Sequence, residues 1–130
     1  MDLEQLLRPR RKSLVLAAES AIRDTKSSLP PKSQLNRLIS ICSEATCVEE
    51  ISNYLRYQAS RRTWSMEFAN LVIAKIETPL GELDSQLRKE PESERDRARV
   101  AAWRLYAVFL ARTLTYTIAV KENPDDRTRR

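Results

Sequence analysis

Arginine and tyrosine side chains concentrate near residue 60, where their chemistry suits phosphate binding and base stacking. The stretch 54–62 holds three arginines, two tyrosines and Gln58. A guanidinium group donates two parallel hydrogen bonds to phosphate oxygens, and a tyrosine ring stacks on a base or ribose. The alternative is that arginines late in a helix only complement its dipole, worth about 0.3–1 kcal/mol each. The phosphate-binding candidates here are Arg56, Arg61 and Arg62, and Gln58 has the amide to join them.

A second set of arginines follows one side of an otherwise apolar segment near residue 105. At 100° per residue Arg97 and Arg104 share nearly one angle with Thr115, and Arg112 lies about 60° away. Such arginines need a carboxylate partner inside the domain, a phosphate from a nucleic acid, or a protein interface. The carboxylates proposed as internal partners are Glu67, Glu77, Glu82 and Asp84.

The composition excludes several kinds of catalytic and metal site. The chain has no histidine, which removes the Ser-His-Asp triad, the histidine base and His-ligated zinc. One glycine excludes the P-loop and the dinucleotide-binding fingerprint. Cys42 and Cys47 have no second pair, so they cannot complete a four-ligand metal site, and we expect reduced thiols. We therefore expect a protein that is not an enzyme and holds no metal or cofactor.

The distribution of charge favours an anionic partner. The chain carries 23 Lys+Arg against 18 Asp+Glu, a net charge of +5 with a pI near 9.5. Residues 63–92 hold three basic and six acidic side chains, a net of −3, so the rest of the chain carries +8. Lys32 and Arg37 are second-choice phosphate contacts. We expect the basic cluster at residues 8–12 to be a solvated helix face.

The elements that position these side chains are all predicted to be helices. One glycine in 130 residues leaves few of the turns that sheets require, and apolar residues recur at helical spacing. We expect Pro9 to kink or divide the first helix, and Thr78-Pro79 with Gly81 to kink or interrupt the fourth. Five helices are expected, at about 2–27, 32–45, 46–62, 64–89 and 91–121.

Patterns within these helices predict a compact all-α bundle. Thr46 and Glu49 have the spacing of a capping box at the start of the third helix. The last helix is apolar nearly all round from Val100 to Val120, so it should be the central element. We expect one domain over residues 1–122 and a disordered polar tail over 123–130.

Two further hypotheses concern location and a possible DNA reader. The longest apolar stretch, at residues 100–111, falls short of the roughly 20 residues of a membrane span. The acidic start of the chain is unlike a signal peptide, so a cytoplasmic protein without membrane contact is expected.

Residues 33–62 have the helix lengths of a helix-turn-helix, although Thr46-Cys47 stands where a glycine is usual. A stand-alone DNA-binding regulator and a helical protein-interaction module are therefore the alternative functions.

The region around the first arginine set also resembles a known family. Residues 29–38 read LPPKSQLNRL, and residues 49–61 read EEISNYLRYQASR. These stretches resemble the small subunits of multi-subunit CRISPR effector (Cascade-like) complexes. The match covers residues 29–62 and extends into the following helix, about a third of the chain.

The resemblance implies a non-catalytic helical subunit of an RNA-guided surveillance complex. Such a subunit stacks in several copies beside the backbone and large subunits, near the guide RNA and the target nucleic acid. Its basic residues would follow the phosphates of a target or displaced strand. The residues assigned to this contact rest on the charge pattern above, and they are Arg56, Arg61, Arg62, Arg104 and Arg112, then Lys32 and Arg37.

Overall fold

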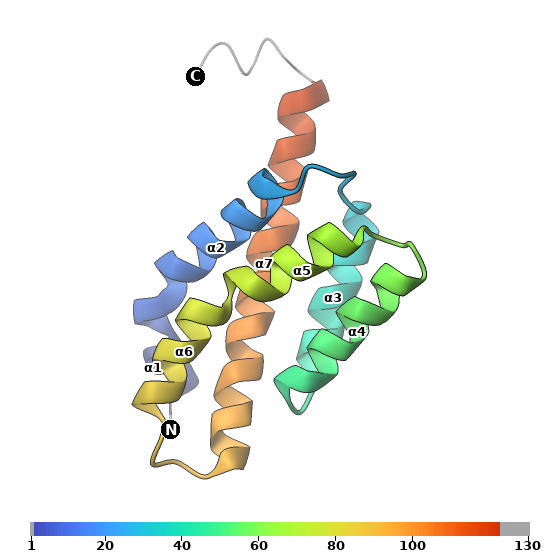
Figure 1. The fold of residues 1–130 in the computed structure, drawn as a ribbon. Helices are drawn as coiled ribbons and strands as arrows, with labels where there is room; N and C mark the ends of the chain where they lie inside the picture. Colours follow the sequence, from blue (N-terminus) through green and yellow to red (C-terminus); the bar gives the residue numbers. More distant parts are fainter. Residues whose placement is uncertain (1, 123–130) are drawn as a thin grey trace.

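The protein is a helical bundle, as expected. The computed structural model describes residues 2–122, in which helices occur and strands do not, so the predicted tail at 123–130 lies outside the described residues (Figure 1). The α-helices are α1 (Leu3–Leu7), α2 (Arg11–Asp24), α3 (Lys32–Glu44), α4 (Val48–Ser60), α5 (Met66–Lys75), α6 (Glu77–Gln86) and α7 (Glu92–Glu122), with a short 3-10 helix, η1 (Arg8–Arg10), between α1 and α2.

The long helix α7 is the centre of the bundle, which confirms the prediction. It packs most extensively against α3 and α2, and it also touches α1, α4 and α6. Trp103, Tyr106, Leu110 and Leu114 of α7 are each at most 1% exposed. The Tyr106 hydroxyl donates a 2.7 Å hydrogen bond to the carbonyl oxygen of Val72 in α5. Apolar residues around most of the α7 circumference thus bind the other helices to one core.

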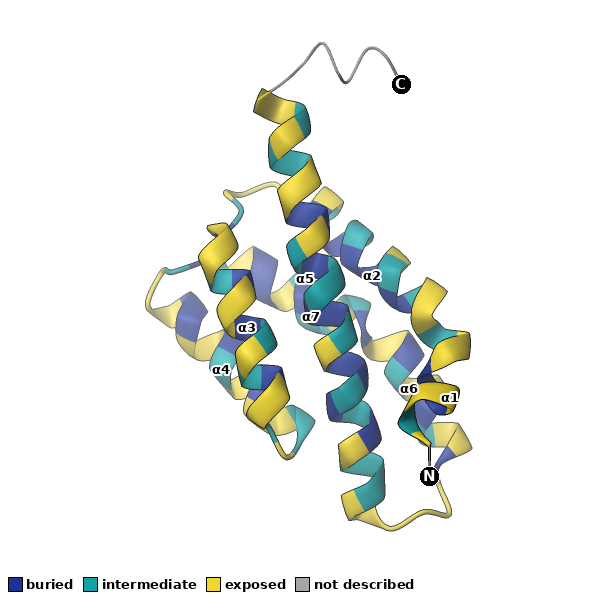
Figure 2. Cartoon of the chain, turned by 180° about the vertical axis from the view of Figure 1, so that it is seen from behind, coloured by how far each residue is buried: buried dark blue, intermediate teal, exposed yellow. Residues whose placement is uncertain are grey.

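The remaining helices lie around α7 in an order that leaves one side open. In Figure 1, α5 crosses in front of α7, α4 lies in front of α3, and α6 lies to the lower left of α7, while α2 and α3 flank it. Figure 2 shows the opposite side, where α3 and α7 run next to each other and are not covered by α4, α5 or α6. The α3–α7 pair therefore presents a surface of its own.

Proline divides the first and fourth predicted helices. Pro9 lies in η1, which separates α1 from α2. The fourth segment breaks at Ile76, the boundary between α5 and α6, and Pro79 lies in the first turn of α6. A proline cannot donate to the carbonyl three or four residues earlier, so the break comes just before it. Gly81 lies within α6 and does not interrupt it, so that part of the prediction was wrong.

The predicted capping box at the start of α4 was also wrong. Cys47 is the N-cap residue, and its side chain forms no capping hydrogen bond. Glu50, not Glu49, accepts hydrogen bonds from the Thr46 hydroxyl at 2.6 Å and the Thr46 backbone N–H at 2.9 Å. These bonds lower the pKa of Glu50 below its ordinary value. The pairing shifts by one residue because the helix begins two residues after Thr46.

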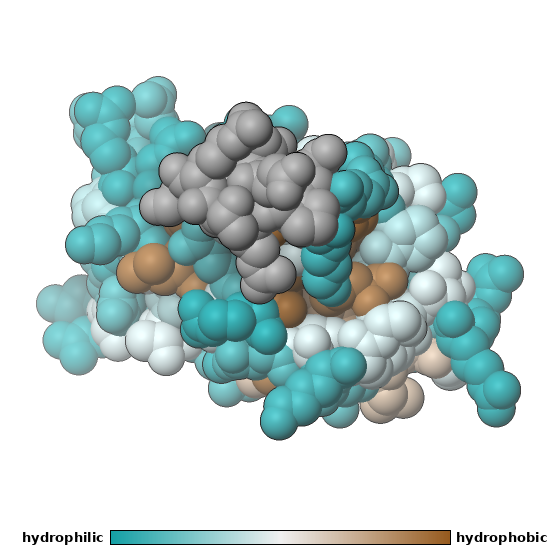
Figure 3. All heavy atoms as spheres, turned by 90° about the horizontal axis from the view of Figure 1, so that it is seen from above, coloured by the Kyte–Doolittle hydropathy of each residue, from teal (hydrophilic) through white to brown (hydrophobic). Residues whose placement is uncertain are grey.

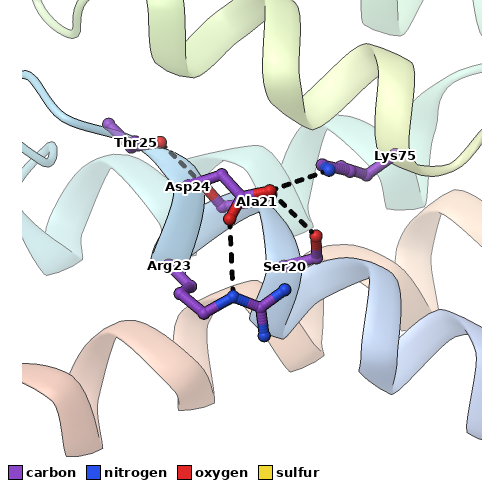
Figure 4. A network of polar contacts seen from close by, with 6 residues as sticks. All are labelled: Ser20, Ala21, Arg23, Asp24, Thr25 and Lys75. Atoms are coloured by element: carbon purple, nitrogen blue, oxygen red, sulfur yellow. Dashed lines mark hydrogen bonds and ion pairs between the residues drawn. The ribbon is translucent and has the colours of Figure 1, made fainter.

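A network of polar contacts fixes the end of α2 against α5. Asp24 accepts from the Lys75 ammonium at 2.9 Å and from the Ser20 hydroxyl at 3.3 Å, and its pKa is lowered chiefly by Lys75 (Figure 4). Glu67 of α5 then accepts the backbone N–H groups of Lys26 and Ser27 at 2.7 and 2.8 Å. The loop from α2 to α3 is therefore held by carboxylates and not by apolar packing alone.

The end of the molecule around the last turns of α7 is mostly polar. Viewed from above along this end, charged and polar side chains form most of the visible surface (Figure 3). Hydrophobic atoms appear there only in separate patches. Tyr116, 43% exposed, donates a 2.9 Å hydrogen bond to Glu19 of α2 at this end.

Candidate nucleic-acid interface

Of the first arginine set, Arg56 lies on the exposed side of α4, and Arg61 and Arg62 follow directly at its C-terminal end; we call the three the arginines of α4. Ile51 and Leu55 are fully buried and turn the opposite side of α4 into the core, as the helical spacing predicts. Arg56 and Tyr57 are exposed, and the Arg61 guanidinium lies 5.5 Å from the centre of the Tyr57 ring. A cation over an aromatic ring at this distance is an attractive contact. It holds a guanidinium and a ring together on the surface.

Gln58 does not belong to this surface. Its side chain is only 4% exposed, because position 58 falls on the side of α4 that faces the core. The prediction that Gln58 bonds a phosphate or a base edge was therefore wrong. Burial also raises the pKa of the neighbouring Tyr54, whose ring packs edge-on against Trp64. Tyr54 is consequently part of the α4–α5 packing and not a free stacking platform.

Arg62 occupies a backbone position that favours glycine. Its φ of 61° is the one positive φ among the described residues. The N–H groups of Arg62 and Thr63 donate to the carbonyl oxygens of Ala59 and Gln58, at 3.0 and 3.1 Å, which is the Schellman pattern at a helix C-terminus. The left-handed residue of that motif is usually glycine, since a Cβ is disfavoured there. An arginine held at this point is a strained choice that places one more cation beside Arg61.

The second arginine set lines the seam between α3 and α7. The Arg104 Nε–H donates a 3.0 Å hydrogen bond to the Ser43 hydroxyl of α3, and the Arg112 guanidinium lies 5.9 Å from the Phe109 ring. Two open hollows follow this seam, of about 820 and 380 Å³. Arg97 and Arg104 line the larger hollow, and Arg112 lines the smaller one. We refer to the two hollows together as the α3–α7 groove.

The carboxylates proposed as internal partners do not pair with these arginines. Glu67 is occupied by the α2–α3 loop, and Asp84 pairs with Arg99 at 2.8 Å. Glu77 and Glu82 are exposed, and within residues 2–122 neither forms an ion pair. The alternative in which these carboxylates neutralise the arginine line was therefore wrong. Arg97 does have a partner, Glu94 of its own helix at 3.7 Å.

The two second-choice cations lie on α3. Lys32 is the first residue of α3, and both Lys32 and Arg37 are exposed. Arg37 faces α4, close enough to Tyr54 for its charge to oppose the rise in the pKa of that phenol. Arg37 therefore lies beside α4, and Lys32 lies at the N-terminal end of α3.

The candidate residues are divided between surfaces and do not form one basic face. The arginines of α4 belong to the layer that lies in front in Figure 1, while Arg104 and Arg112 belong to the α3–α7 surface in front in Figure 2. Spacing in the sequence predicts which residues share one side of a helix, but it does not predict how two helices are rotated relative to each other. It also missed Ser43 and Asn36, the two polar α3 residues that line the groove. Their seven-residue spacing, two helical turns, was the available signal.

All seven candidates share one electrostatic property. Within residues 2–122 every ion pair uses other basic residues, namely Arg8, Arg23, Lys75, Arg97 and Arg99. The seven exposed candidates thus keep their guanidinium or ammonium groups free of carboxylates. Exposed cations without carboxylates are suited to bind an anion, most strongly one with the geometry of phosphate.

The packing of α3 and α4 gives the helix-turn-helix hypothesis no support. The main packing partner of α3 is α7, and that of α4 is α5. The two helices therefore act as separate members of the bundle around the Ala45–Cys47 turn. A recognition helix held on its own partner helix would be the expected arrangement for a major-groove reader.

Comparison with other proteins adds no relative to this description. No protein-family model, curated protein or solved structure matches the chain. In the part of the chain that the structure describes, no helix has the length and apolar character needed to cross a membrane. Both cysteines are free thiols there, as expected, and burial raises the pKa of Cys42 to about 12.

Proposed function

We propose that this protein binds the sugar–phosphate backbone of a nucleic acid as a non-catalytic subunit of a larger assembly. The observation that carries the proposal is a set of seven exposed cations that have no carboxylate partner among residues 2–122, a property that Arg11 and Arg88 share, together with the contacts that hold two of the seven. The arrangement of Arg61 on Tyr57 and of Arg104 on Ser43 orients two of the guanidinium groups before any ligand arrives. Orientation in advance lowers the entropy cost of binding.

Binding of this kind is independent of base sequence. Phosphate contacts fix the position of a strand but carry no information about its bases. Three phosphates held on a single strand would give a log–log salt slope of about −2, at roughly −0.7 per phosphate. The salt dependence of affinity is therefore the first property to measure.

The assembly that we propose is a CRISPR effector complex. The ground for this part is the resemblance of residues 29–62 to the small subunits of such complexes, with the helical fold and basic balance in support. In this proposal several copies stack beside the backbone and large subunits, and the cations contact a target or displaced strand. The guide RNA would be held by the neighbouring subunits and not by this chain.

The backbone-binding proposal is tested by fluorescence anisotropy of a labelled single strand over a series of salt concentrations. We expect Arg56→Ala with Arg61→Ala, and separately Arg104→Ala with Arg112→Ala, to weaken binding and to flatten the salt slope by about 0.7 per lost phosphate contact. The matched control removes two exposed arginines elsewhere, Arg11→Ala with Arg88→Ala. A flat salt response of the unmodified chain, or equal losses in all three pairs, would contradict the proposal.

The assembly is tested separately by purifying the tagged chain together with the products of its neighbouring genes. A large particle that contains several proteins and one short RNA of uniform length supports the effector subunit, and native mass spectrometry then gives the copy number. A free monomer or dimer without RNA contradicts that assembly. In that case the anisotropy experiment still shows whether the chain binds a nucleic-acid backbone on its own.

A further inference from the structure

The larger hollow of the α3–α7 groove has features that backbone binding does not require. Its volume of about 820 Å³ lies within the range of small-molecule sites. It is bounded by the C-terminal end of α3, the α3–α4 turn and the first half of α7. A strand held only by its phosphates would need a positive surface, but not a hollow lined in part by apolar side chains.

Three kinds of group follow one another along the α7 wall of this hollow. Asp96, Val100 and Arg104 are each four residues apart, so they lie on one side of the helix over roughly 12 Å. The order is a carboxylate, an apolar stretch and a guanidinium, and Arg97, which pairs with Glu94, lines the hollow beside the carboxylate. A ligand that matches it carries a hydrogen-bond donor at one end, a flat apolar body and an anion at the other end.

The apolar part of the hollow is built from small side chains. Val100 and Ala101 of α7 face Cys42 and Ala45 of α3 and the following turn. These side chains are small, and a planar ring can lie against them in the open hollow at the α3–α7 seam. The hydroxyls of Ser43, Thr46 and Ser93 line the same hollow and are suited to the hydroxyls of a sugar.

The two charged ends differ in how they are held. The Arg104 guanidinium is oriented by the 3.0 Å bond from its Nε to Ser43, which leaves its terminal nitrogen atoms for a phosphate. Asp96 lies 3.7 Å from the Arg99 guanidinium of its own helix, and its side chain is 22% exposed. A carboxylate accepts hydrogen bonds and donates none, so it favours an amino group over the carbonyl oxygen that uracil has at the same ring position.

We infer that this hollow binds a nucleoside monophosphate unit that has an amino-bearing base. The base lies on Val100 and Ala101 with its amino group toward Asp96, and the phosphate lies on Arg104. The ligand is a free mononucleotide or one unpaired nucleotide of a strand, which share this chemistry. The inference goes beyond the proposed function, because the arginines of α4 play no part in it.

The test uses the isotopically labelled full chain and NMR titration with CMP, UMP, ribose 5-phosphate and inorganic phosphate. CMP and UMP have nearly the same shape, but only CMP has an amino group. We expect CMP to bind at least fivefold more tightly than UMP and at least tenfold more tightly than ribose 5-phosphate or phosphate. Asp96→Asn should bring the CMP and UMP affinities close together. Equal affinities for CMP and UMP in the unmodified chain would overturn the inference.

Matched variants distinguish the hollow from the rest of the surface. Ala101→Leu fills the hollow and should abolish CMP binding, while Ala74→Leu makes the same change at an exposed position of α5. Arg104→Ala should lower the affinity for CMP at least tenfold, and Arg88→Ala should leave this affinity unchanged. CMP binding that survives Ala101→Leu, or that shifts amides remote from this hollow, would refute the site.

A second measurement needs no variant and so does not depend on whether Ala101→Leu folds. Cys47 lines the hollow and is partly exposed, so bound CMP should slow its alkylation by iodoacetamide at least threefold, and UMP should not. An alkylation rate that CMP does not change contradicts the inference. Oligonucleotide binding that depends on Arg56 and Arg61 without any CMP binding would refute the hollow alone. CMP binding with a flat salt response to oligonucleotides would refute the proposed function alone.

Discussion

Arg99 and Arg104 belong to the same helix, yet their surroundings are opposite. Arg99 has a side chain only 20% exposed, and it lies between Asp84 of α6 at 2.8 Å and Asp96 at 3.7 Å. Arg104 is exposed, and it donates a hydrogen bond to the neutral hydroxyl of Ser43 in α3. One arginine is neutralised inside the fold, and the other keeps its charge at the surface.

The difference teaches that the neighbouring helix decides the role of an arginine on α7. The acidic helix α6 packs near the first turns of α7 and supplies a carboxylate there. On another side of α7 the neighbour is α3, which supplies Ser43 and Asn36 to the groove. Arg99, which pairs with α6, therefore stabilises the fold, and Arg104, which contacts α3, is left for a ligand. The predictions below try to break this contrast.

The largest effect on stability is expected from Arg99→Ala. Its loss leaves Asp84 without its ion-pair partner, and we expect the free energy of unfolding to fall by about 1–2 kcal/mol, because both side chains are partly desolvated. Arg104→Ala should change it by less than about 0.5 kcal/mol. Urea denaturation followed by circular dichroism measures both values. Equal losses for the two variants would break the contrast.

A gain in stability is expected from Arg62→Gly. Glycine relieves the positive φ of 61°, so we expect unfolding to cost about 1 kcal/mol more, while oligonucleotide binding weakens. Arg61→Gly removes the same charge at a φ of −83°, where glycine gives no such relief. Thermal unfolding compares the two variants. If both shift the melting temperature in the same direction and by the same amount, strain at Arg62 is not the cause.

The contrast can be removed by supplying the missing carboxylate. Ser43→Asp places an acid beside Arg104, and we expect the salt slope of oligonucleotide binding to flatten by about 0.7, as in Arg104→Ala. The free energy of unfolding should change by less than about 0.5 kcal/mol. The gain from the new ion pair is offset because a negative charge in the last turn of α3 interacts unfavourably with the helix dipole. Ser85→Asp adds the same charge in the last turn of α6 as a control. Binding equal to that of the unmodified chain after Ser43→Asp would contradict the role of Arg104.

The smallest effect is local and concerns a carboxylate that does not serve the arginines. Hydrogen bonds from the Ser27 and Lys26 backbone lower the pKa of Glu67, so its contribution to stability is present above the ordinary carboxyl pKa and is lost as the pH falls through the lowered value. Amide NMR shifts of Lys26 and Ser27 should follow this titration. In Glu67→Gln the titration should disappear, with nucleic-acid binding unchanged. Shifts that persist in this variant would assign the titration to another group.

The sequence was sufficient for the parts of the fold that depend on local chemistry. The scarcity of glycine and the spacing of residues such as Leu14 and Leu55 predicted an all-α bundle with these side chains buried. The apolar circumference of residues 100–120 predicted the central place of α7. Pro9 was correctly placed at a helix boundary, since a missing N–H acts on its own turn.

The parts that failed depend on how elements meet in space. Arg99 was not recognised as the partner of Asp84, because the turn between α6 and α7 sets which face of each helix is opposed. Gln58 was considered a possible ligand contact from its residue type alone, but its position on α4 directs its side chain into the core. The division of the seven cations between surfaces likewise follows from the rotation of α4 relative to α7, which no spacing within one helix encodes.

The position of α7 in the chain has a consequence for folding during synthesis. Among the described elements, the helix that buries the others is the last to be made. At roughly 5–20 residues per second its 31 residues take about 2–6 s to appear. For that time the apolar sides of α2 and α3 have no permanent cover. We expect the nascent chain to depend on chaperones until the last turns of α7 leave the ribosome.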